Sequence, residues 1–182
     1  RLAGAEAGRT MKIFQLILLL ALPLLAACKE DDANLAVPSA MVLNEDAAGF
    51  YCQMVILDHP GPKAQIHLAG YPQPLWFSQV RDGIAYLKSP EQTAEVLVLY
   101  VNDMGAAASW EHPGQANWIN AKTAFFVVGS NARGGMGAPE IVPFADRAAA
   151  LTFAKERGGE VLDLGSIPIE AVLAPVDTQS NK

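Results

Sequence analysis

An apolar run that ends in a cysteine constrains this chain more than any other feature. Residues 13–25 are apolar apart from two positions, and small residues lead from them to Cys28. The run is short for a membrane span and ends in the small residues of a cleavage site, so it predicts a secretory signal peptide over residues 11–27. Cys52, the other of the two cysteines, is then the one thiol of the folded part, with no second thiol to pair with in an oxidising compartment.

The sequence Leu-Ala-Ala-Cys at residues 25–28 resembles the lipobox of bacterial lipoproteins. The resemblance implies cleavage before Cys28, lipid on its sulfur and an acylated amino group. An ordinary signal peptide with a chance cysteine is the alternative. We expect the mature protein in the periplasm, anchored by lipid, with the outer membrane favoured because Lys29 rather than Asp follows the cysteine. Residues 1–10 lack an initiator Met and are interpreted as an upstream extension.

Charge limits the class of partner. The chain has 13 basic and 19 acidic residues, and residues 1–27 contain three of the basic and one of the acidic ones, so the mature part carries a net charge of −8. Such a chain is poorly suited to binding nucleic acid, whose phosphates have to be neutralised, but it can attract cations. No second long apolar segment follows the signal, so lipid is the membrane attachment that we expect.

Hydrophobic patterning predicts short strands and two helices. Residues 28–48 contain the lipidated cysteine and a polar segment that we interpret as a tether. Strands are expected at residues 49–57, 64–68, 95–101, 123–128, 140–143 and 161–164, with helices at residues 78–88 and 145–157. We expect the first two strands to pair as a hairpin. Residues 170–182 are interpreted as a loose tail.

The two halves of this pattern look alike. Phe77 precedes the first helix and Phe144 the second, and a lysine follows each phenylalanine after eleven residues. We therefore predict an α+β fold of two small homologous β-β-α-β units, antiparallel sheets each with one helix, that arose by duplication. The units are expected over residues 49–113 and 114–169. Chance similarity of two short amphipathic helices is the alternative.

Cys52 and Met54 are the residues that most strongly indicate chemistry. Residues two apart in a strand point to the same face, so the spacing predicts a thiolate beside a thioether. These soft donors favour Cu(I) over Mg²⁺, Ca²⁺ or Mn²⁺, and two sulfur ligands are too few for a structural zinc site. A buried cysteine beside a core methionine is the alternative, although an unpaired thiol in an oxidising compartment makes it less attractive.

A trigonal Cu(I) site needs a third ligand from elsewhere in the chain. The candidates are Met136, Met104, His112, His59 and His67. Met136 lies in a loop with three glycines, which is flexible enough to deliver a sulfur. Imidazole also suits copper, but a surface role is the alternative for each histidine. His67 alternates with apolar neighbours and is expected to face solvent.

Catalytic motifs are scarce in this sequence. It has no Cys-x-x-Cys motif, which excludes a thioredoxin-like dithiol mechanism. The glycine-rich loop at residues 134–137 is not followed by Lys-Ser/Thr, so it is not a phosphate-binding loop. Nothing near Cys52 in the sequence supports a cysteine–histidine nucleophile pair. We therefore expect a protein that is not an enzyme.

An ordered set of motifs covers nearly all of the mature chain. It comprises the lipobox at Cys28, Phe-Tyr-Cys-Gln-Met at 50–54, Tyr-Val-Asn-Asp at 100–103, residues 126–130 leading to Met136-Gly137, and residues 144–148 with 158–162. The set resembles the NosL family, lipoprotein accessory factors of nitrous oxide reductase. The resemblance implies a periplasmic Cu(I) chaperone with two β-β-α-β units that supplies the reductase's copper centres, chiefly the copper–sulfide cluster.

The resemblance also implies site residues and partners. By position it makes Cys52, Met54 and Met136 the copper ligands. Met104 and His112 stay less certain candidates, which rest on their residue types and loop positions and not on the resemblance. Many family members have glycine where this chain has Gln53, whose side chain we expect to point away from the metal. The implied partners are the reductase and an ABC-type transporter complex with its periplasmic partner.

Three competing hypotheses remain open at this stage. The first is a lipoprotein that docks onto a transporter complex without transferring metal. The second is a copper store rather than a carrier, which the sequence cannot distinguish. The third is an enzyme related to organomercurial lyase, whose chemistry needs a second cysteine that the mature chain lacks.

Overall fold

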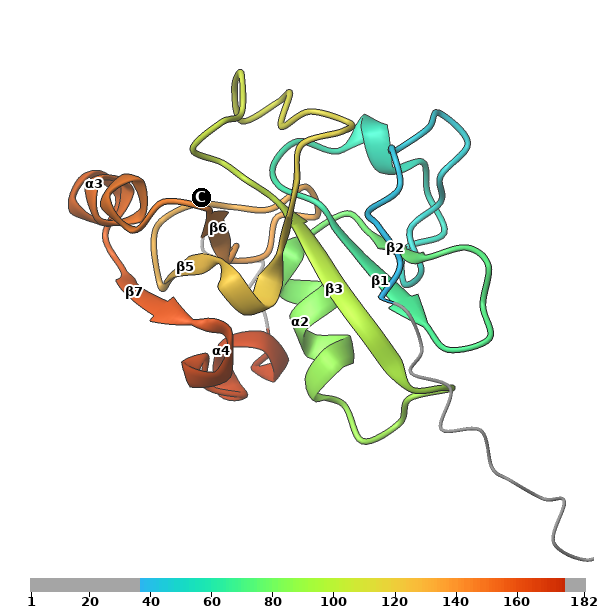
Figure 1. Ribbon diagram of the computed structural model, residues 1–182. Helices are drawn as coiled ribbons and strands as arrows, with labels where there is room; N and C mark the ends of the chain where they lie inside the picture. The colour runs from blue at the N-terminus through green and yellow to red at the C-terminus, as the bar shows by residue number, and fades with distance from the viewer. Residues whose placement is uncertain (1–36, 176–182) are drawn as a thin grey trace, which may run out of the picture. The chain divides into compact units, whose positions relative to one another are not determined.

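The computed structural model describes residues 37–175, which contain two antiparallel sheets (Figure 1). The first sheet has the strand order β2-β1-β3-β4 and consists of β1 (Ala64–Leu68), β2 (Leu75–Phe77), β3 (Val96–Asn102) and β4 (Trp118–Asn120). The second sheet has the order β6-β5-β7 and consists of β5 (Phe125–Val128), β6 (Val142–Phe144) and β7 (Glu160–Asp163). The predicted signal peptide and Cys28 lie outside the described residues.

Helices lie against both sheets. Helix α2 (Val80–Lys88) packs on β1, β2 and β3, and α3 (Arg147–Arg157) packs on β5, β6 and β7 (Figure 1). A short helix, α4 (Glu170–Leu173), contacts α2. Three 3₁₀ turns complete the described chain: η2 (Ile56–Asp58), η3 (Ala121–Thr123) and η4 (Leu164–Ser166). Between residues 37 and 175 there is no helix with the length and apolar character needed to cross a bilayer.

The two sheets have the same topology. In each β-β-α-β unit the first strand is central and pairs with the second and third strands, as β1 does with β2 and β3 and β5 does with β6 and β7. Phe77 ends β2 and Phe144 ends β6, so the equal spacing to the lysines reflects equivalent strand-to-helix turns. The predicted α+β fold is therefore confirmed. Strand β4 lies beyond residue 114, where we placed the boundary between the units, yet it pairs with β3 and extends the first sheet.

One hydrophobic core joins the two units. Val80 and Ile84 of α2 are fully buried in it, together with Phe126 and Ile141 from the second half of the chain. Helix α3 is far more exposed, and Ala150 is its one buried residue. Burial of apolar side chains is the main stabilising term in a fold of this kind. The shared core therefore fixes α2 at the point where the two units meet.

Residues 49–57 do not form the predicted strand, and the predicted hairpin with residues 64–68 is wrong. The backbone of Gln53 has a φ of 56°, which lies in the left-handed region and ends any extended segment. The Gln53 N–H donates to Gly49 O at 2.8 Å, and the Gly49 N–H donates to Met54 O at 2.9 Å. The segment is therefore a closed turn, and alternation along a strand cannot place Cys52 and Met54 on one face.

Residues 37–48 pack on the fold, so the prediction of a tether is wrong for this part of the chain. Leu43 is only 3% exposed and forms a small cluster with Ile56. The Met41 N–H donates to Gln65 Oε1 at 2.8 Å, and Gln65 Nε2 donates back to Met41 O at 2.9 Å. The few apolar residues of this polar segment are enough to hold it in place, because they pack against buried residues of the fold.

All five residues of β1 are buried, His67 among them. The expectation that His67 faces solvent is therefore wrong, and its ring Nε2 lies 2.9 Å from Gln65 Oε1. Burial lowers the pKa of the imidazole, because the charged form loses hydration. Polar–apolar alternation predicts one solvated face, but in this strand both faces are covered.

The chain from Glu170 to residue 175 is ordered by α2, so the prediction of a loose tail is wrong up to that point. Arg81 Nε donates to Val172 O at 3.2 Å, and its Nη2 donates to Ala174 O at 2.7 Å. Val172 is buried in the shared core. A buried guanidinium needs acceptors, and the carbonyl groups around α4 supply them.

Glu140 is a buried acid between α2 and the second unit. Its Oε1 accepts the backbone N–H groups of Arg81 at 3.0 Å and of Ile141 at 2.9 Å. Its Oε2 has no hydrogen-bond partner among residues 37–175. Burial raises the pKa of this carboxyl to about 8, against the opposing effect of the two N–H donors and of Lys63. The folded protein therefore keeps Glu140 protonated at neutral pH.

We predict that Glu140→Gln makes stability less dependent on pH. Between about pH 4.5 and pH 8 the unfolded chain ionises this carboxyl while the folded chain keeps its proton. The folded state then binds more protons, so the wild-type free energy of unfolding falls as pH rises through that window. Glutamine keeps the Oε1 acceptor and cannot ionise. Denaturant unfolding at pH 5 and pH 8 measures the free energy of unfolding of both proteins. As pH rises, the wild type should lose stability relative to the variant, by on the order of 1 kcal/mol per pH unit at most.

The histidines do not confound this comparison, because both proteins carry them. The lowered pKa of His67 contributes equally to each curve and cancels in the difference. Lys63, whose pKa burial lowers to about 8, titrates at the upper end of the window and is present in both proteins. Stability profiles that run parallel from pH 5 to pH 8 would contradict the assignment of a protonated Glu140.

Candidate metal site

Cys52 lies in a tight turn beside Ser78. Ser78 and Gln79 link β2 to α2, and we name these two residues the β2–α2 junction. The thiol Sγ lies 3.9 Å from Ser78 Oγ and is partly exposed. A Cβ atom at Gly49 would overlap Cys52 Sγ, so glycine is the residue that leaves the thiol its place. The turn therefore holds the thiol against the protein while leaving it accessible.

The Gln53 side chain stabilises this turn from within. Its Nε2 donates to Phe50 O at 2.8 Å and to Gly49 O at 3.3 Å. These bonds offset part of the strain of a left-handed backbone at a residue other than glycine. The Gln53 amide thus folds back over the turn's own backbone.

Aromatic packing fixes the turn to the end of the first sheet. The Phe50 N–H donates to Trp76 O at 2.7 Å. The Phe50 and Tyr51 rings lie 5.9 Å and 5.5 Å from the Phe77 ring, and Phe50 also meets Tyr86 of α2 edge-on at 5.5 Å. Such pairs add stability beyond their buried area. The aromatic residues that suggested a strand therefore serve to dock a turn.

Met136 occupies the tip of a hairpin formed by residues 133–139. Arg133 bridges to Pro139, and the Gly137 N–H donates to Gly134 O at 2.8 Å to close the turn. Gly137 has a φ of 80°, a conformation that suits glycine. The glycine-rich loop is thus a tight turn.

The Cys52 turn and the Met136 hairpin each contact one residue of the β2–α2 junction. The Met136 N–H donates to Gln79 Oε1 at 3.1 Å, and Gln79 directly follows Ser78, the residue beside the Cys52 thiol. The hairpin also packs on the loop after the Cys52 turn, since a Cβ at Gly135 would lie 2.5 Å from His59 Cβ. Two segments more than eighty residues apart therefore lie on neighbouring residues.

The two thioethers are unusually open for methionine. Met54 is 42% exposed and Met136 is 43% exposed. A flexible thioether in this position is free to turn its sulfur toward a soft metal ion. In the described part of the chain, no group of three or more His, Cys, Asp or Glu side chains is arranged to hold a metal. A metal site at this place would therefore depend on sulfur from methionine.

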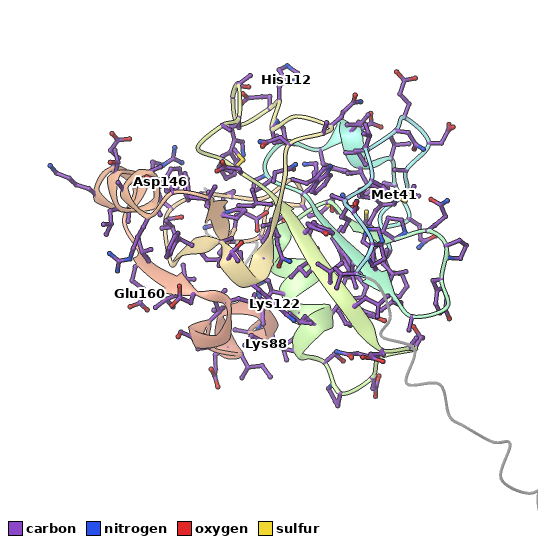
Figure 2. All side chains as sticks on the ribbon, in the orientation of Figure 1. Met41, Lys88, His112, Lys122, Asp146 and Glu160 are labelled. Atoms are coloured by element: carbon purple, nitrogen blue, oxygen red, sulfur yellow. The ribbon has the colours of Figure 1, made fainter. Side chains whose placement is uncertain are left out.

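The other candidate ligands have different surroundings. Met104 packs beside β6 and α3, and its N–H donates to Pro143 O at 2.9 Å. His112 is exposed in the long loop between β3 and β4, labelled at the upper edge of Figure 2. His59 and His112 both line a cavity of 310 Å³. As copper ligands these residues stay predictions.

Sequence patterns missed the residues that bring this site together. We expected the first helix to begin at residue 78, but α2 begins at Val80 with Gln79 as its N-cap residue, and Ser78 lies beside the thiol instead. Nothing in the sequence near Gln79 indicates a contact with residue 136. The paired glycines at 134 and 135 are the only signal, because consecutive glycines often mark a close approach of backbone to another part of the fold.

Comparison with known proteins agrees with the fold and with the sequence motifs. The NosL family model matches residues 40–172. The copper-binding lipoprotein NosL of Achromobacter cycloclastes is 59% identical over 161 residues, which cover 88% of this chain and 82% of that protein. The copper-binding lipoprotein NosL of Stutzerimonas stutzeri is 36% identical over 112 residues, 61% of this chain and 56% of that protein.

A solved structure gives the same result. The crystal structure of the copper chaperone NosL from Shewanella denitrificans matches with a TM-score of 0.67 and 31% sequence identity, over 71% of this chain and 95% of that one. The family match covers well over half of the chain, and the identity to curated relatives extends through both β-β-α-β units. The chain therefore belongs to the NosL family.

Proposed function

We propose that this protein is a lipid-anchored carrier of Cu(I) in the periplasm. It binds the metal with Cys52, Met54 and Met136 and passes it on for assembly of the copper–sulfide centre of nitrous oxide reductase. The names of its relatives support copper binding and the lipoprotein state. Lipid attachment at Cys28 and the predicted periplasmic location rest on the lipobox.

The observation that carries this proposal is that the Cys52 turn and the Met136 hairpin contact consecutive residues, Ser78 and Gln79. The Cys52 thiol lies 3.9 Å from Ser78 Oγ, the Met136 backbone N–H donates to Gln79 Oε1, and both Cys52 and Met136 are at least partly exposed. Thiolate and thioether donors match the preference of Cu(I) for soft ligands. Two exposed methionines and a partly exposed free cysteine fit a cargo site better than a packed core.

The open position of the thioethers suits transfer. A Cu(I) ion held by three sulfur ligands can accept a donor from a partner before it releases one of its own. Met54 and Met136 are the exposed ligands and would be displaced first, while Cys52 retains the ion until the last step. The metal then moves between proteins without being released into solution.

Apolar side chains around the Cys52 turn support contact with a partner protein. Phe50, Tyr51, Val55 and Leu57 are each between 37% and 54% exposed. We propose that this surface meets the periplasmic partner of an ABC-type transporter complex, or the reductase itself. The same surface favours the second candidate function, a docking lipoprotein that transfers no metal.

Substitution of the sulfur ligands separates these two functions. Cys52→Ser should lower the Cu(I) affinity by at least about 100-fold, because it replaces an anionic soft donor, and Met54→Ala by about tenfold. Competition of the soluble domain against a chromophoric Cu(I) chelator measures both. Met41→Ala is the matched control, since Met41 lies beside Gln65, and it should leave the affinity unchanged. Equal affinity of the wild type and Cys52→Ser would favour the docking function.

Copper binding should weaken in acid. A thiol loses its proton when it becomes a metal ligand, so each bound Cu(I) releases up to one proton. The apparent affinity should then fall by up to about tenfold per pH unit as pH decreases. Chelator competition between pH 8 and pH 6, corrected for the chelator's own protonation, measures the slope. Cys52→Ser should show a flatter profile, and a flat profile for the wild type would contradict the release of a thiol proton on binding.

A further inference from the structure

We propose that Gln79 is a positioning residue for copper binding, which holds the Met136 hairpin so that the thioether lies beside the Cys52 thiol. The inference rests on the proposed function and adds to it the residue that assembles the site. Gln79 itself presents no sulfur and is almost fully buried, with 3% of its surface exposed. Its effect on the metal would be exerted through Met136.

Both ends of the Gln79 amide are engaged. The Oε1 atom accepts the Met136 N–H at 3.1 Å, and Nε2 donates to Asp82 Oδ2 at 2.9 Å in the first turn of α2. An amide nitrogen can only donate and an amide oxygen can only accept, so the bond to Asp82 sets which atom faces the hairpin. The helix therefore fixes the orientation of the acceptor on which Met136 rests.

Glycine at position 134 lets the hairpin approach this acceptor. A Cβ atom there would lie 2.5 Å from Gln79 Oε1 and 2.5 Å from Glu140 Oε2, closer than real side chains come. The backbone of the hairpin thus lies directly on two buried oxygen atoms. A larger residue at position 134 would have to displace these two side chains or move the hairpin away from the β2–α2 junction.

Lys63 supports the opposite side of the hairpin. Its Nζ donates to the carbonyl oxygens of His59 at 2.7 Å, Pro60 at 3.1 Å and Gly61 at 2.6 Å, which holds that loop in place. A Cβ atom at Gly135 would lie 2.5 Å from His59 Cβ and 2.9 Å from Pro60 O. The hairpin is therefore held between the β2–α2 junction and a loop that a buried ammonium fixes.

This arrangement matters because Met136 has little else to place it. Its side chain is 43% exposed, so core packing does not determine where the sulfur lies. A neutral thioether is a modest ligand, and its contribution depends on how much order the site must gain when the metal binds. An anchored hairpin provides that order in advance. Loss of the anchor should cost affinity even though no ligand is removed.

A double-mutant cycle between Gln79 and Met136 tests the proposal. Gln79→Leu keeps the size of the side chain but removes the acceptor, and it should weaken Cu(I) binding between about threefold and tenfold. In a Met136→Ala background the same change should have little further effect, because the ligand that Gln79 positions is already gone. Chelator competition measures all four proteins. An undiminished effect of Gln79→Leu without Met136 would overturn the proposal, as would no effect in its presence.

A second substitution, measured beside a matched control, separates a loss of copper binding from a loss of folding. Gly134→Ala should displace the hairpin and weaken binding as Gln79→Leu does. Gly165→Ala is the matched control, because a Cβ there meets nothing within 4 Å, and it should bind like the wild type. Thermal unfolding of the apo proteins reports stability separately. If Gly134→Ala folds and binds copper as tightly as the control does, copper binding does not depend on the close contact between the hairpin and Gln79, and the proposal fails.

The two proposals fail differently. If neither the wild type nor any variant competes with the chelator, or if Cys52→Ser binds as well as the wild type, the proposed carrier function is wrong. If binding depends on Cys52 but Met136→Ala and Gln79→Leu both match the wild type, the carrier function stands and the positioning role of Gln79 is wrong.

Discussion

The packing of α2 into the core shared by both units is the constraint on which the candidate site depends. Val80 and Ile84 are fully buried, so the start of the helix cannot shift without disturbing that core. Ser78 and Gln79 come directly before Val80, so the buried start of the helix holds their backbone in place. The Cys52 turn and the Met136 hairpin are irregular segments. The hairpin is held by Gln79, and the turn by Trp76 and Phe77 just before the junction. Rigid elements hold the flexible ligands in place.

The sequence predicted the regular parts of the fold because their signals are local. Helix α2, helix α3 and the repeated strand-to-helix turns at Phe77 and Phe144 follow from periodicity over short windows. Cys52 and Met54 were chosen for the chemistry of their sulfur atoms, although the strand used to pair them does not exist. One backbone angle, the positive φ of Gln53, replaced that strand with a turn, and aromatic composition alone could not reveal it.

The remaining errors come from tertiary contacts that no local pattern contains. Residues 37–48 have the composition of a tether, but Leu43 packs against Ile56. His67 has the pattern of an exposed residue, but it is buried and its ring lies beside the Gln65 side chain. The contact between Gln79 and residue 136 spans the two units and has no counterpart in the sequence pattern around either residue. Sequence patterns can therefore identify candidate ligand residues, but they do not show which distant segments of the chain come together to form a site.

The methionine methyl groups give the most direct test of the central claim that one site unites the two segments. Carbon-13 labelling of these methyl groups reports each thioether separately by NMR. On addition of one equivalent of Cu(I), the account predicts that the signals of Met54 and Met136 shift together and saturate at the same ratio. The signals of Met104 and Met41 should stay in place. A shift of Met54 without Met136, or of Met104 instead, would contradict a site built at the β2–α2 junction.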